Sequence, residues 1–252
     1  PGCSRASPAI GWGGGREMML MDVHEDLIAR LAPDSLLRAL APEQLRSLLA
    51  SASRCDLKVG EAIITQGDEG GDFAVVVLSG GLKISMVSAG GREIILNYAG
   101  PGELVGEIAM LDSGPRTATV SAAVPTSVLL LPSATFLAAA TANPASAAGV
   151  MRELAKRIRQ LNLVIESDRT FSMAPRLARA LLRLIDPERS DGRLRYDPSQ
   201  SDIGAFAGLA RENVSRLISD WAEQGVVERK GRALLVRDRD YLEALAAAGD
   251  EA

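Results

Sequence analysis

The sequence predicts an α+β protein in which a strand-rich domain precedes a long helix and a mainly helical domain. Between Cys55 and Pro132, short runs rich in β-branched residues alternate with glycine-rich turns, a pattern typical of an antiparallel sandwich, barrel or roll. From Val150 to Phe171, glycine is absent and apolar residues recur at helical spacing. The remainder favours short helices and a strand hairpin.

The 252 residues divide into four expected segments. They are a flexible N-terminal extension at 1–33, a strand domain at 34–148, a long helix at 149–172 and a C-terminal domain at 173–252. Pro1–Arg16 is rich in Gly, Ser and Pro and lacks an initiating methionine. We therefore expect disorder there, with a native start at Met18, Met19 or Met21.

The strand domain begins with a helical segment at Ser35–Ser51, where Pro42 occupies a position suited to the start of a second helix. Six strands are predicted after it, each bounded by Gly, Asp, Ser or Pro. They are Ala62–Thr65, Phe73–Leu78, Leu82–Val87, Glu93–Tyr98, Ala118–Ala123 and Ser127–Leu131.

The long helix carries an apolar stripe with coiled-coil spacing. The stripe is formed by Leu154, Ile158, Leu161 and Ile165. Such a stripe packs either on its own domain or on a second copy of the helix. We expect the second arrangement, a homodimer through helix 149–172.

The C-terminal domain has the pattern of a winged helix-turn-helix. A helix is expected at Arg176–Ile185, and Ser201–Gly225 then places Gly208 at a tight turn between two helices. The second of these helices opens with a polar face, formed by Arg211, Glu212, Ser215 and Arg216. In this motif that end of the second helix enters the major groove of DNA, where arginine can bond guanine and glutamate can accept from cytosine, so we expect these residues to contact bases.

Residues 228–232 read Glu-Arg-Lys-Gly-Arg between two apolar strands, as in a basic wing that contacts phosphates. Residues 173–240 hold thirteen Lys/Arg against eleven Asp/Glu. DNA binding must therefore depend on placement of charge, and a dimer would double the phosphate contacts. A winged helix used only for protein contacts is the alternative. The DNA-binding candidates are Gln200, Ser201, Arg211, Glu212, Ser215, Arg216 and Lys230.

The composition excludes several kinds of site. The net charge is −4, and two cysteines with one histidine cannot assemble a zinc set or a four-thiolate cluster. Cys3 and Cys55 could pair, but reduced cysteines in a cytoplasmic protein are the simpler interpretation. No apolar run approaches the ~18 residues needed to cross a bilayer. We expect neither a metal site nor a membrane span.

The stretch Gly106–Val120 combines groups that suit a small nucleotide. Glu107 stands before a short apolar run, and Arg116 and Thr117 follow a Ser-Gly-Pro turn. Free backbone N–H groups after Gly106, the guanidinium and the hydroxyl are donors for one phosphate. The carboxylate can accept a hydrogen bond from a ribose.

This stretch resembles the phosphate-binding cassette of cyclic-nucleotide-binding domains, whose pattern is Gly-Glu-apolar-Ala/Gly, a variable turn and Arg-Ser/Thr-Ala. The sequence Arg211-Glu212-Asn213-Val214-Ser215-Arg216 looks like the recognition helix of the cyclic-AMP receptor protein family. Together the similarities cover about Leu36–Leu245 in the order of that superfamily, which also contains the fumarate-nitrate regulators. The resemblance implies an antiparallel β-roll, a dimerisation helix and a winged helix-turn-helix.

The resemblance also implies roles for individual residues. Glu107 would hold the ribose 2′-hydroxyl, and Arg116 with Thr117 the cyclic phosphate. Leu82 and Leu96 would pack near the base, and Leu161 and Asn162 would face it. The ligand-binding candidates are Gly106, Glu107, Ile108, Ala109, Arg116, Thr117, Leu82, Leu96, Arg157, Leu161 and Asn162.

The effector stays open between cyclic AMP and cyclic GMP. Leucine at 161 cannot bond a base, whereas Asn162 can serve adenine or guanine, and Thr117 suits either nucleotide. The expected mechanism is allosteric: the nucleotide orders the cassette and the long helix, and the paired helices place two reading heads on a palindrome of GTGA-like half-sites. RNA polymerase is a further candidate partner.

Three other interpretations compete with this one. An enzyme would need a nucleophile and a base, and no such set is apparent, so we expect no catalytic residues. A regulatory subunit of a kinase or channel would share the cassette but not the winged helix. A regulator that senses something else, or binds DNA independently of cyclic nucleotide, is the nearest alternative. The intact pair of Glu107 and Arg116 argues against it.

Overall fold

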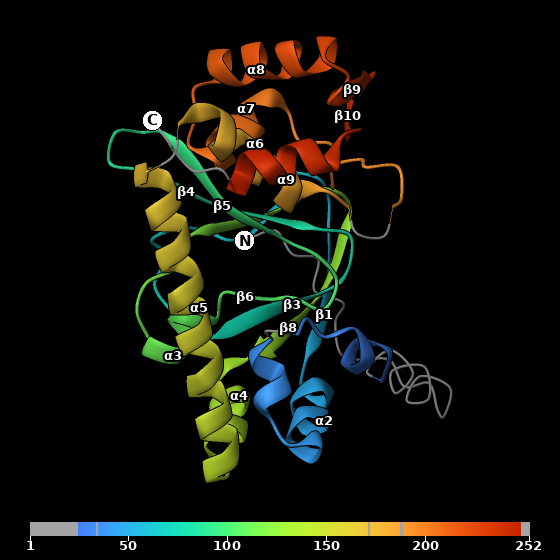
Figure 1. The fold of residues 1–252 in the computed structure, drawn as a ribbon. Coiled ribbons are helices and arrows are strands. Elements are labelled where there is room, and N and C mark those ends of the chain that lie inside the picture. The colour runs from blue at the N-terminus through green and yellow to red at the C-terminus, as the bar shows by residue number, and fades with distance from the viewer. Residues whose placement is uncertain (1–24, 34, 171, 187–188, 248–252) are drawn as a thin grey trace. The chain divides into compact units, whose positions relative to one another are not determined.

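The computed structural model describes residues 25–33, 35–170, 172–186 and 189–247 (Figure 1). These residues form two compact units. The first unit comprises the described residues up to Val87 together with Asn97–Ile158, and the second comprises Ser88–Leu96 with the described residues from Arg159 onward. The predicted α+β class is confirmed.

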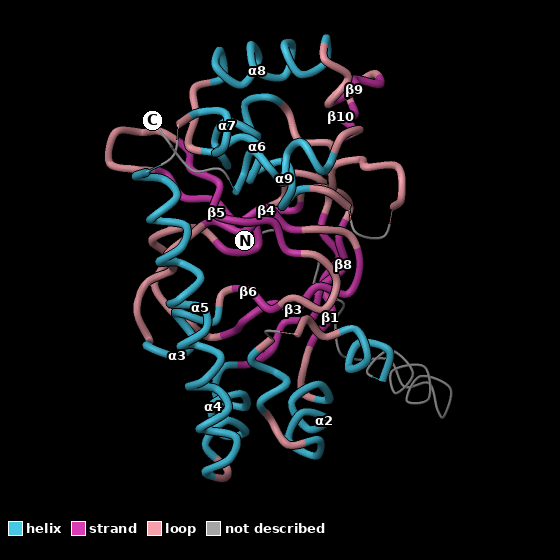
Figure 2. Tube along the Cα trace, viewed as in Figure 1, coloured by secondary structure: helices cyan, strands magenta, loops and turns pink. Residues whose placement is uncertain are grey.

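The strands of the β-roll form two four-stranded sheets, ordered β1-β8-β3-β6 and β2-β7-β4-β5 (Figure 2). β3 pairs antiparallel with both β8 and β6, and β7 pairs antiparallel with both β2 and β4. The strands are β1 (Ser53–Leu57), β2 (Ala62–Ile64), β3 (Phe73–Ser79), β4 (Leu82–Val87), β5 (Glu93–Ala99), β6 (Leu104–Val105), β7 (Thr119–Ala122) and β8 (Thr126–Pro132).

Strand β3 serves two hydrophobic cores. Because successive side chains of a strand point to opposite faces, Val75 and Val77 enter the core between the two sheets, and Ala74 and Val76 enter a second core against the helices. All four side chains are fully buried. This explains why the strand reads as a continuous apolar run rather than an alternating one.

The helices of the first unit surround that second core. Residues 25–30 are helical, and the predicted segment 35–51 is observed as two helices, with Pro42 in the first turn of the second. The named helices are η1 (Leu36–Ala39), α2 (Pro42–Ala50), α3 (Glu107–Asp112), α4 (Ser133–Thr141) and α5 (Pro144–Thr170), of which α5 continues into the second unit from Arg159 onward.

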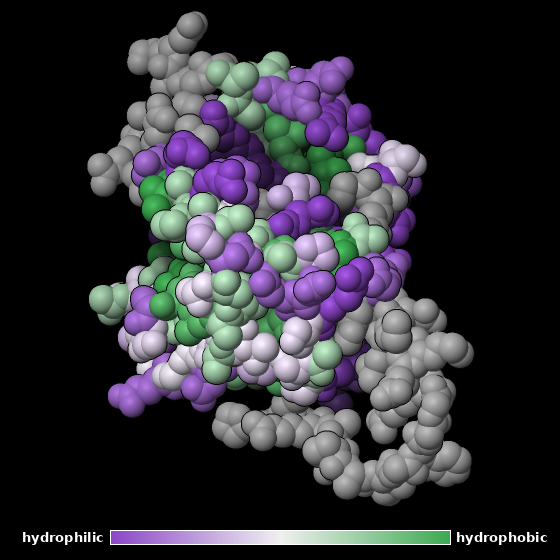
Figure 3. All heavy atoms as spheres, turned by 90° about the horizontal axis from the view of Figure 1, so that it is seen from below, coloured by the Kyte–Doolittle hydropathy of each residue, from purple (hydrophilic) through white to green (hydrophobic). Residues whose placement is uncertain are grey.

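Some elements differ from the prediction. β1, β6 and α4 were not predicted, and α5 begins at Pro144 rather than at residue 149. Exposed alanines at 138, 142, 145 and 148 leave α4 and the start of α5 without an apolar period. Seen from below, the surface is a mixture of pale, green and purple side chains (Figure 3). Gly149 lies inside α5, where an added Cβ would come within 2.8 Å of the Ala39 Cβ.

One expectation about the cysteines is wrong. Cys55, in β1, is buried and disulfide-bonded, whereas we expected reduced thiols. That expectation rested on cellular compartment and on the composition of the tail, neither of which reports on the surroundings of β1. Cys3 and the N-terminal extension up to residue 24 lie outside the described residues. Among the described helices, none combines the length and apolarity needed to span a membrane.

The second unit contains the predicted helix-turn-helix and hairpin. α6 begins at Met173, so Pro175 lies in its first turn, where a missing N–H costs nothing. Ser199 caps α7 by accepting the Asp202 N–H at 3.1 Å. The elements are α6 (Met173–Leu184), α7 (Gln200–Ala207), α8 (Arg211–Glu223), β9 (Val227–Lys230), β10 (Ala233–Val236) and α9 (Arg239–Ala247).

Candidate functional site

Gly106 sets the direction in which the chain enters α3. Its φ is +85°, in the left-handed region that favours glycine. A Cβ added there would lie 2.6 Å from the Ile64 Cδ1 and 3.2 Å from the Arg116 Nη1. Glycine is therefore favoured at position 106 for two reasons: the left-handed backbone conformation and the lack of space for a Cβ.

Arg116 is buried beside this turn, with 6% of its surface exposed. Its Nη1 donates to the Gly106 carbonyl at 2.9 Å, and its Nη2 donates to the Phe73 carbonyl at 2.8 Å. The guanidinium carbon also lies 4.8 Å from the centre of the Phe73 ring, within range of a cation–π contact. Burial lowers the pKa of Arg116, and the carboxylates of Asp72 and Asp68 act in the opposite direction.

Glu107, the first residue of α3, is also buried and forms an ion pair with Arg157 of α5. Both side chains are largely removed from water, with 11% and 26% of their surfaces exposed. A close charged pair in such surroundings is stronger than one at the surface. The pair connects the cassette to the long helix within the first unit.

The other predicted ligand residues lie in different surroundings. Within the cassette, Ala109 is buried, whereas Ile108 and Thr117 are exposed. Leu82 is fully buried in the core between the sheets. The remaining candidates, Leu96, Leu161 and Asn162, are exposed. The structure thus brings together Gly106, Glu107, Arg116 and Arg157 and leaves the base-facing roles as predictions.

The contacts between the loop of residues 67–73 and Arg116 were not predicted from the sequence. The Arg116 N–H donates to the Asp68 carbonyl at 2.9 Å, and the Gly67 N–H donates to the Arg116 carbonyl at 2.8 Å. On the same loop, a Cβ on Gly71 would lie 1.8 Å from the Ala109 carbonyl oxygen. The glycine-rich sequence of residues 67–71 is typical of a turn between strands, but glycine also marks a close approach of two backbones, as at Gly71.

The helix-turn-helix of the second unit consists of α7, a turn at Gly208, and α8. Gly208, with φ +68°, ends α7, and the Arg176 Nη2 of α6 donates to its carbonyl at 3.1 Å. The start of α8 lines an open groove of about 480 Å³. Its lining residues are Gln200, Arg211, Glu212, Ser215, Arg216 and Ser219. Five of the seven predicted DNA-binding residues therefore share one surface, which Ser219 extends.

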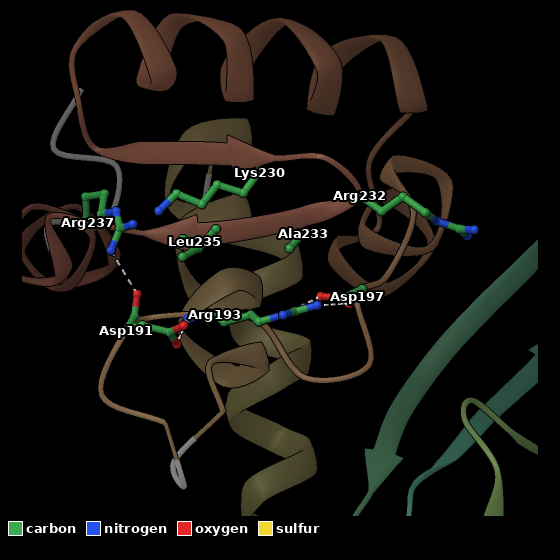
Figure 4. Close-up of a pocket in the computed structure, with 8 residues that line it drawn as sticks. All are labelled: Asp191, Arg193, Asp197, Lys230, Arg232, Ala233, Leu235 and Arg237. Atoms are coloured by element: carbon green, nitrogen blue, oxygen red, sulfur yellow. Dashed lines mark hydrogen bonds and ion pairs between the residues drawn. The ribbon is translucent and has the colours of Figure 1, made fainter.

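The wing carries a network of ion pairs. The Arg237 Nε donates to a Glu228 carboxylate oxygen at 2.7 Å, and the Lys230 Nζ lies 3.6 Å from the other. The hydrogen bond from Arg237 lowers the pKa of Glu228. Figure 4 shows Arg237 bonded to the loop at Asp191 and Lys230 lying along the hairpin. The predicted phosphate contact at Lys230 thus lies beside a carboxylate.

Comparison with known proteins agrees with both units. Residues 54–143 match the model of the cyclic nucleotide-binding domain, and residues 175–245 match that of the Crp-like helix-turn-helix domain. The chain is 34% identical to the cyclic AMP receptor protein of Thermus thermophilus, over 84% of this chain and 96% of that protein. The chain belongs to the CRP/FNR family.

Two further proteins similar to this chain have names that do not mention cyclic AMP. The transcriptional activator protein anr of Pseudomonas aeruginosa is 30% identical over 86% of this chain and 90% of that protein. The structure of FixK2 from Bradyrhizobium japonicum is 27% identical, with a TM-score of 0.67, and covers 78% of this chain and 98% of that one. This CRP/FNR protein is a DNA-binding transcription regulator with a cyclic-nucleotide-binding domain.

Proposed function

We propose that this regulator binds cyclic AMP or cyclic GMP at its cassette and that the nucleotide controls DNA recognition. One observation carries the proposal. Among the described residues, Glu107 and Arg116 are the only charged residues that are buried. A buried charge is costly unless it is paired or used, and both of these lie in the segment predicted to hold ribose and phosphate.

Each residue of the cassette has a role in this proposal. Arg116 binds the cyclic phosphate together with Thr117 and the backbone at Gly106, Ile108 and Ala109. Glu107 accepts a hydrogen bond from the ribose 2′-hydroxyl, while the ion pair with Arg157 holds the carboxylate in place. Cyclic AMP is part of the name of several relatives, among them those of Thermus thermophilus and Mycobacterium tuberculosis. Asn162 leaves the base open, since its amide both donates and accepts.

The exposed side of α5 supports a homodimer. Met151, Ile158 and Leu161 are 62%, 60% and 60% exposed and lie at the spacing of a coiled-coil seam. Paired helices would place two copies of α8 on successive major grooves of a palindrome with GTGA-like half-sites. RNA polymerase is a further proposed partner, and a DNA target implies the cytoplasm.

The test is calorimetric titration of the purified protein with cyclic AMP and, separately, with cyclic GMP. Micromolar binding of one nucleotide identifies the effector. Arg116→Lys keeps the charge but loses the two-pronged geometry, so we expect nucleotide affinity to fall at least about tenfold. Arg54→Lys is the matched control, because Arg54 is exposed and lies outside the cassette. Full affinity in Arg116→Lys would disprove the assignment.

A second candidate function is DNA binding that does not depend on cyclic nucleotide. Two observations favour it: Arg116 already donates to two backbone carbonyls, and Leu161 cannot bond a base. Under this alternative, titration with cyclic AMP or cyclic GMP gives no heat of binding, and neither nucleotide displaces a bound nucleotide. The affinity for operator DNA is then the same with and without nucleotide. An operator affinity that rises on addition of nucleotide would exclude it.

A further inference from the structure

The polar face of α8 carries a carboxylate and a guanidinium that are spaced to pair with each other. Glu212 precedes Arg216 by four residues, so both side chains lie on one face of the helix. An acidic residue N-terminal to a basic one at this spacing is the favourable order for an ion pair. Within the described part of the chain, however, Glu212 forms neither an ion pair nor a hydrogen bond. It is exposed and lines the groove at the start of α8.

Arg216 is bonded to Asn213 instead. The Arg216 Nη2 donates to the Asn213 Oδ1 at 3.3 Å, between residues three positions apart. Asn213 is half-buried and does not line the groove, whereas Arg216 is exposed in it. A guanidinium carries several N–H donors, so one hydrogen bond to Asn213 leaves the others for a guanine edge. The contact thus fixes the direction of the arginine without using up its capacity to bind a base.

We propose that Asn213 is a positioning residue for DNA recognition: it keeps Arg216 apart from Glu212, so that both side chains stay available to base edges. The inference rests on the proposed function, because it assigns base contacts to these two residues. Asparagine suits the role, since its side-chain oxygen accepts the hydrogen bond that a guanidinium can only donate. An Arg216 paired with Glu212 would hold both side chains against each other along the helix, and neither would reach its own base pair.

Asn213→Ala should release Arg216 to pair with Glu212. A complete bidentate contact discriminates between bases by about 5- to 150-fold. We therefore expect the preference at the base pairs read by Arg216 and Glu212 to fall by about three- to tenfold each. Affinity for scrambled DNA should change by less than about twofold, since no charge is altered. Alanine favours a helix more than asparagine does, so a weaker α8 would not explain the loss.

The experiment is fluorescence anisotropy of the full-length protein, with cyclic AMP and cyclic GMP both present. The probes are a palindromic duplex of GTGA half-sites, its single-base-pair variants and a scrambled duplex. Arg216→Ala and Glu212→Ala first identify the base pair that each side chain reads. Asn213→Asp keeps an acceptor at the same position, so base preference should be retained while the added negative charge weakens binding to every duplex. Gln224→Ala is the matched control, because it removes a carboxamide from the other end of α8, outside the groove.

The double variant of Asn213→Ala with Glu212→Ala separates positioning from direct contact. If Asn213 acts by keeping Arg216 from Glu212, its loss should have no further effect at the Arg216 base pair once that carboxylate is gone. The same loss with and without Glu212 would show that Asn213 contacts DNA itself or only supports the helix, and would overturn the inference.

Three further outcomes count against the inference. An unchanged base preference in Asn213→Ala would overturn it, and so would an equal loss of preference in Gln224→Ala. Failure of the unaltered protein to distinguish the GTGA duplex from its variants, or an unchanged preference in both Arg216→Ala and Glu212→Ala, would reject the proposed base contacts themselves, and this inference with them.

Discussion

Gly106 is under two constraints that can be separated by substitution. Its left-handed backbone is a constraint that it shares with Gly60, whose φ is +80°. Only Gly106 also lacks space for a Cβ, because Ile64 and Arg116 fill it, whereas nothing lies within 4 Å of a Cβ on Gly60. The difference between the two positions therefore measures packing alone.

We predict that Gly60→Ala lowers the free energy of unfolding by about 1 kcal/mol through the left-handed backbone. Gly106→Ala should lower it by about 1–3 kcal/mol more, because the new methyl group overpacks the site. Urea unfolding of both variants gives the comparison. Equal losses of unfolding free energy in the two variants would mean that the side chains of Ile64 and Arg116 can move aside without cost. Nucleotide affinity should fall only in Gly106→Ala, since only that methyl group meets Arg116.

At the scale of elements, the helices and strands that could be predicted from the sequence are those with a clear apolar period or bounding glycines. Six strands, the long helix and the helix-turn-helix each carry a clear apolar period or glycine punctuation. β1 mixes polar and apolar residues, β6 is too short to show a pattern, and α4 is dominated by alanine. These elements form because tertiary contacts favour them, and such contacts are invisible in a local pattern.

The candidate site was predictable to the same extent. The resemblance to a known cassette pointed to Glu107 and Arg116, and both are buried. It did not indicate that Phe73 would lie under the guanidinium or that Arg157 would pair with Glu107. Those contacts join residues separated by 43 and 50 positions, which no local pattern connects.

The contact between the loop of residues 67–73 and α3 should be sensitive to a single methyl group. Gly71→Ala places a Cβ 1.8 Å from a backbone carbonyl of α3, and a backbone atom cannot rotate away. We predict a loss of about 1–3 kcal/mol in unfolding free energy, together with weaker nucleotide binding. Gly90→Ala is the control, because its nearest neighbour would be 4.0 Å away and its φ is not positive. Equal stability of the two variants by urea unfolding would contradict the prediction.

For the whole molecule, the homodimer proposed above depends on the exposed apolar residues Met151, Ile158 and Leu161 of α5. Ile158→Glu introduces like charges at the centre of the proposed seam, whereas Arg152→Glu changes an exposed neighbour on the same helix. We expect Ile158→Glu to sediment as a monomer and to lose operator binding by at least about 100-fold, because each half-site is then bound alone. Arg152→Glu should stay dimeric. A dimeric Ile158→Glu would place the interface elsewhere.

The salt dependence of operator binding separates contacts to phosphate from contacts to bases. Lys230→Gln should weaken binding to all sequences alike and reduce the salt slope by about 2 in a dimer, one phosphate contact for each wing. Arg211→Gln should instead relax the preference at one base pair of each half-site by about 1–3 kcal/mol. Titrations of a specific and a scrambled duplex at several salt concentrations distinguish the two. An unchanged slope in Lys230→Gln would remove the wing from the interface.

Strand β3 links the two hydrophobic cores of the first unit. Its alternate side chains complete two separate cores, so we expect the two cores to unfold together. Native-state hydrogen exchange should therefore find the amides of residues 74–77 among the slowest of this unit, exchanging only when both cores unfold together. Phe73, which starts this strand, is also the residue whose carbonyl holds Arg116. If a bound phosphate drew the guanidinium of Arg116 away from Phe73, the start of β3 would lose this hydrogen bond. Amide hydrogen exchange near Phe73 should then become faster when nucleotide binds.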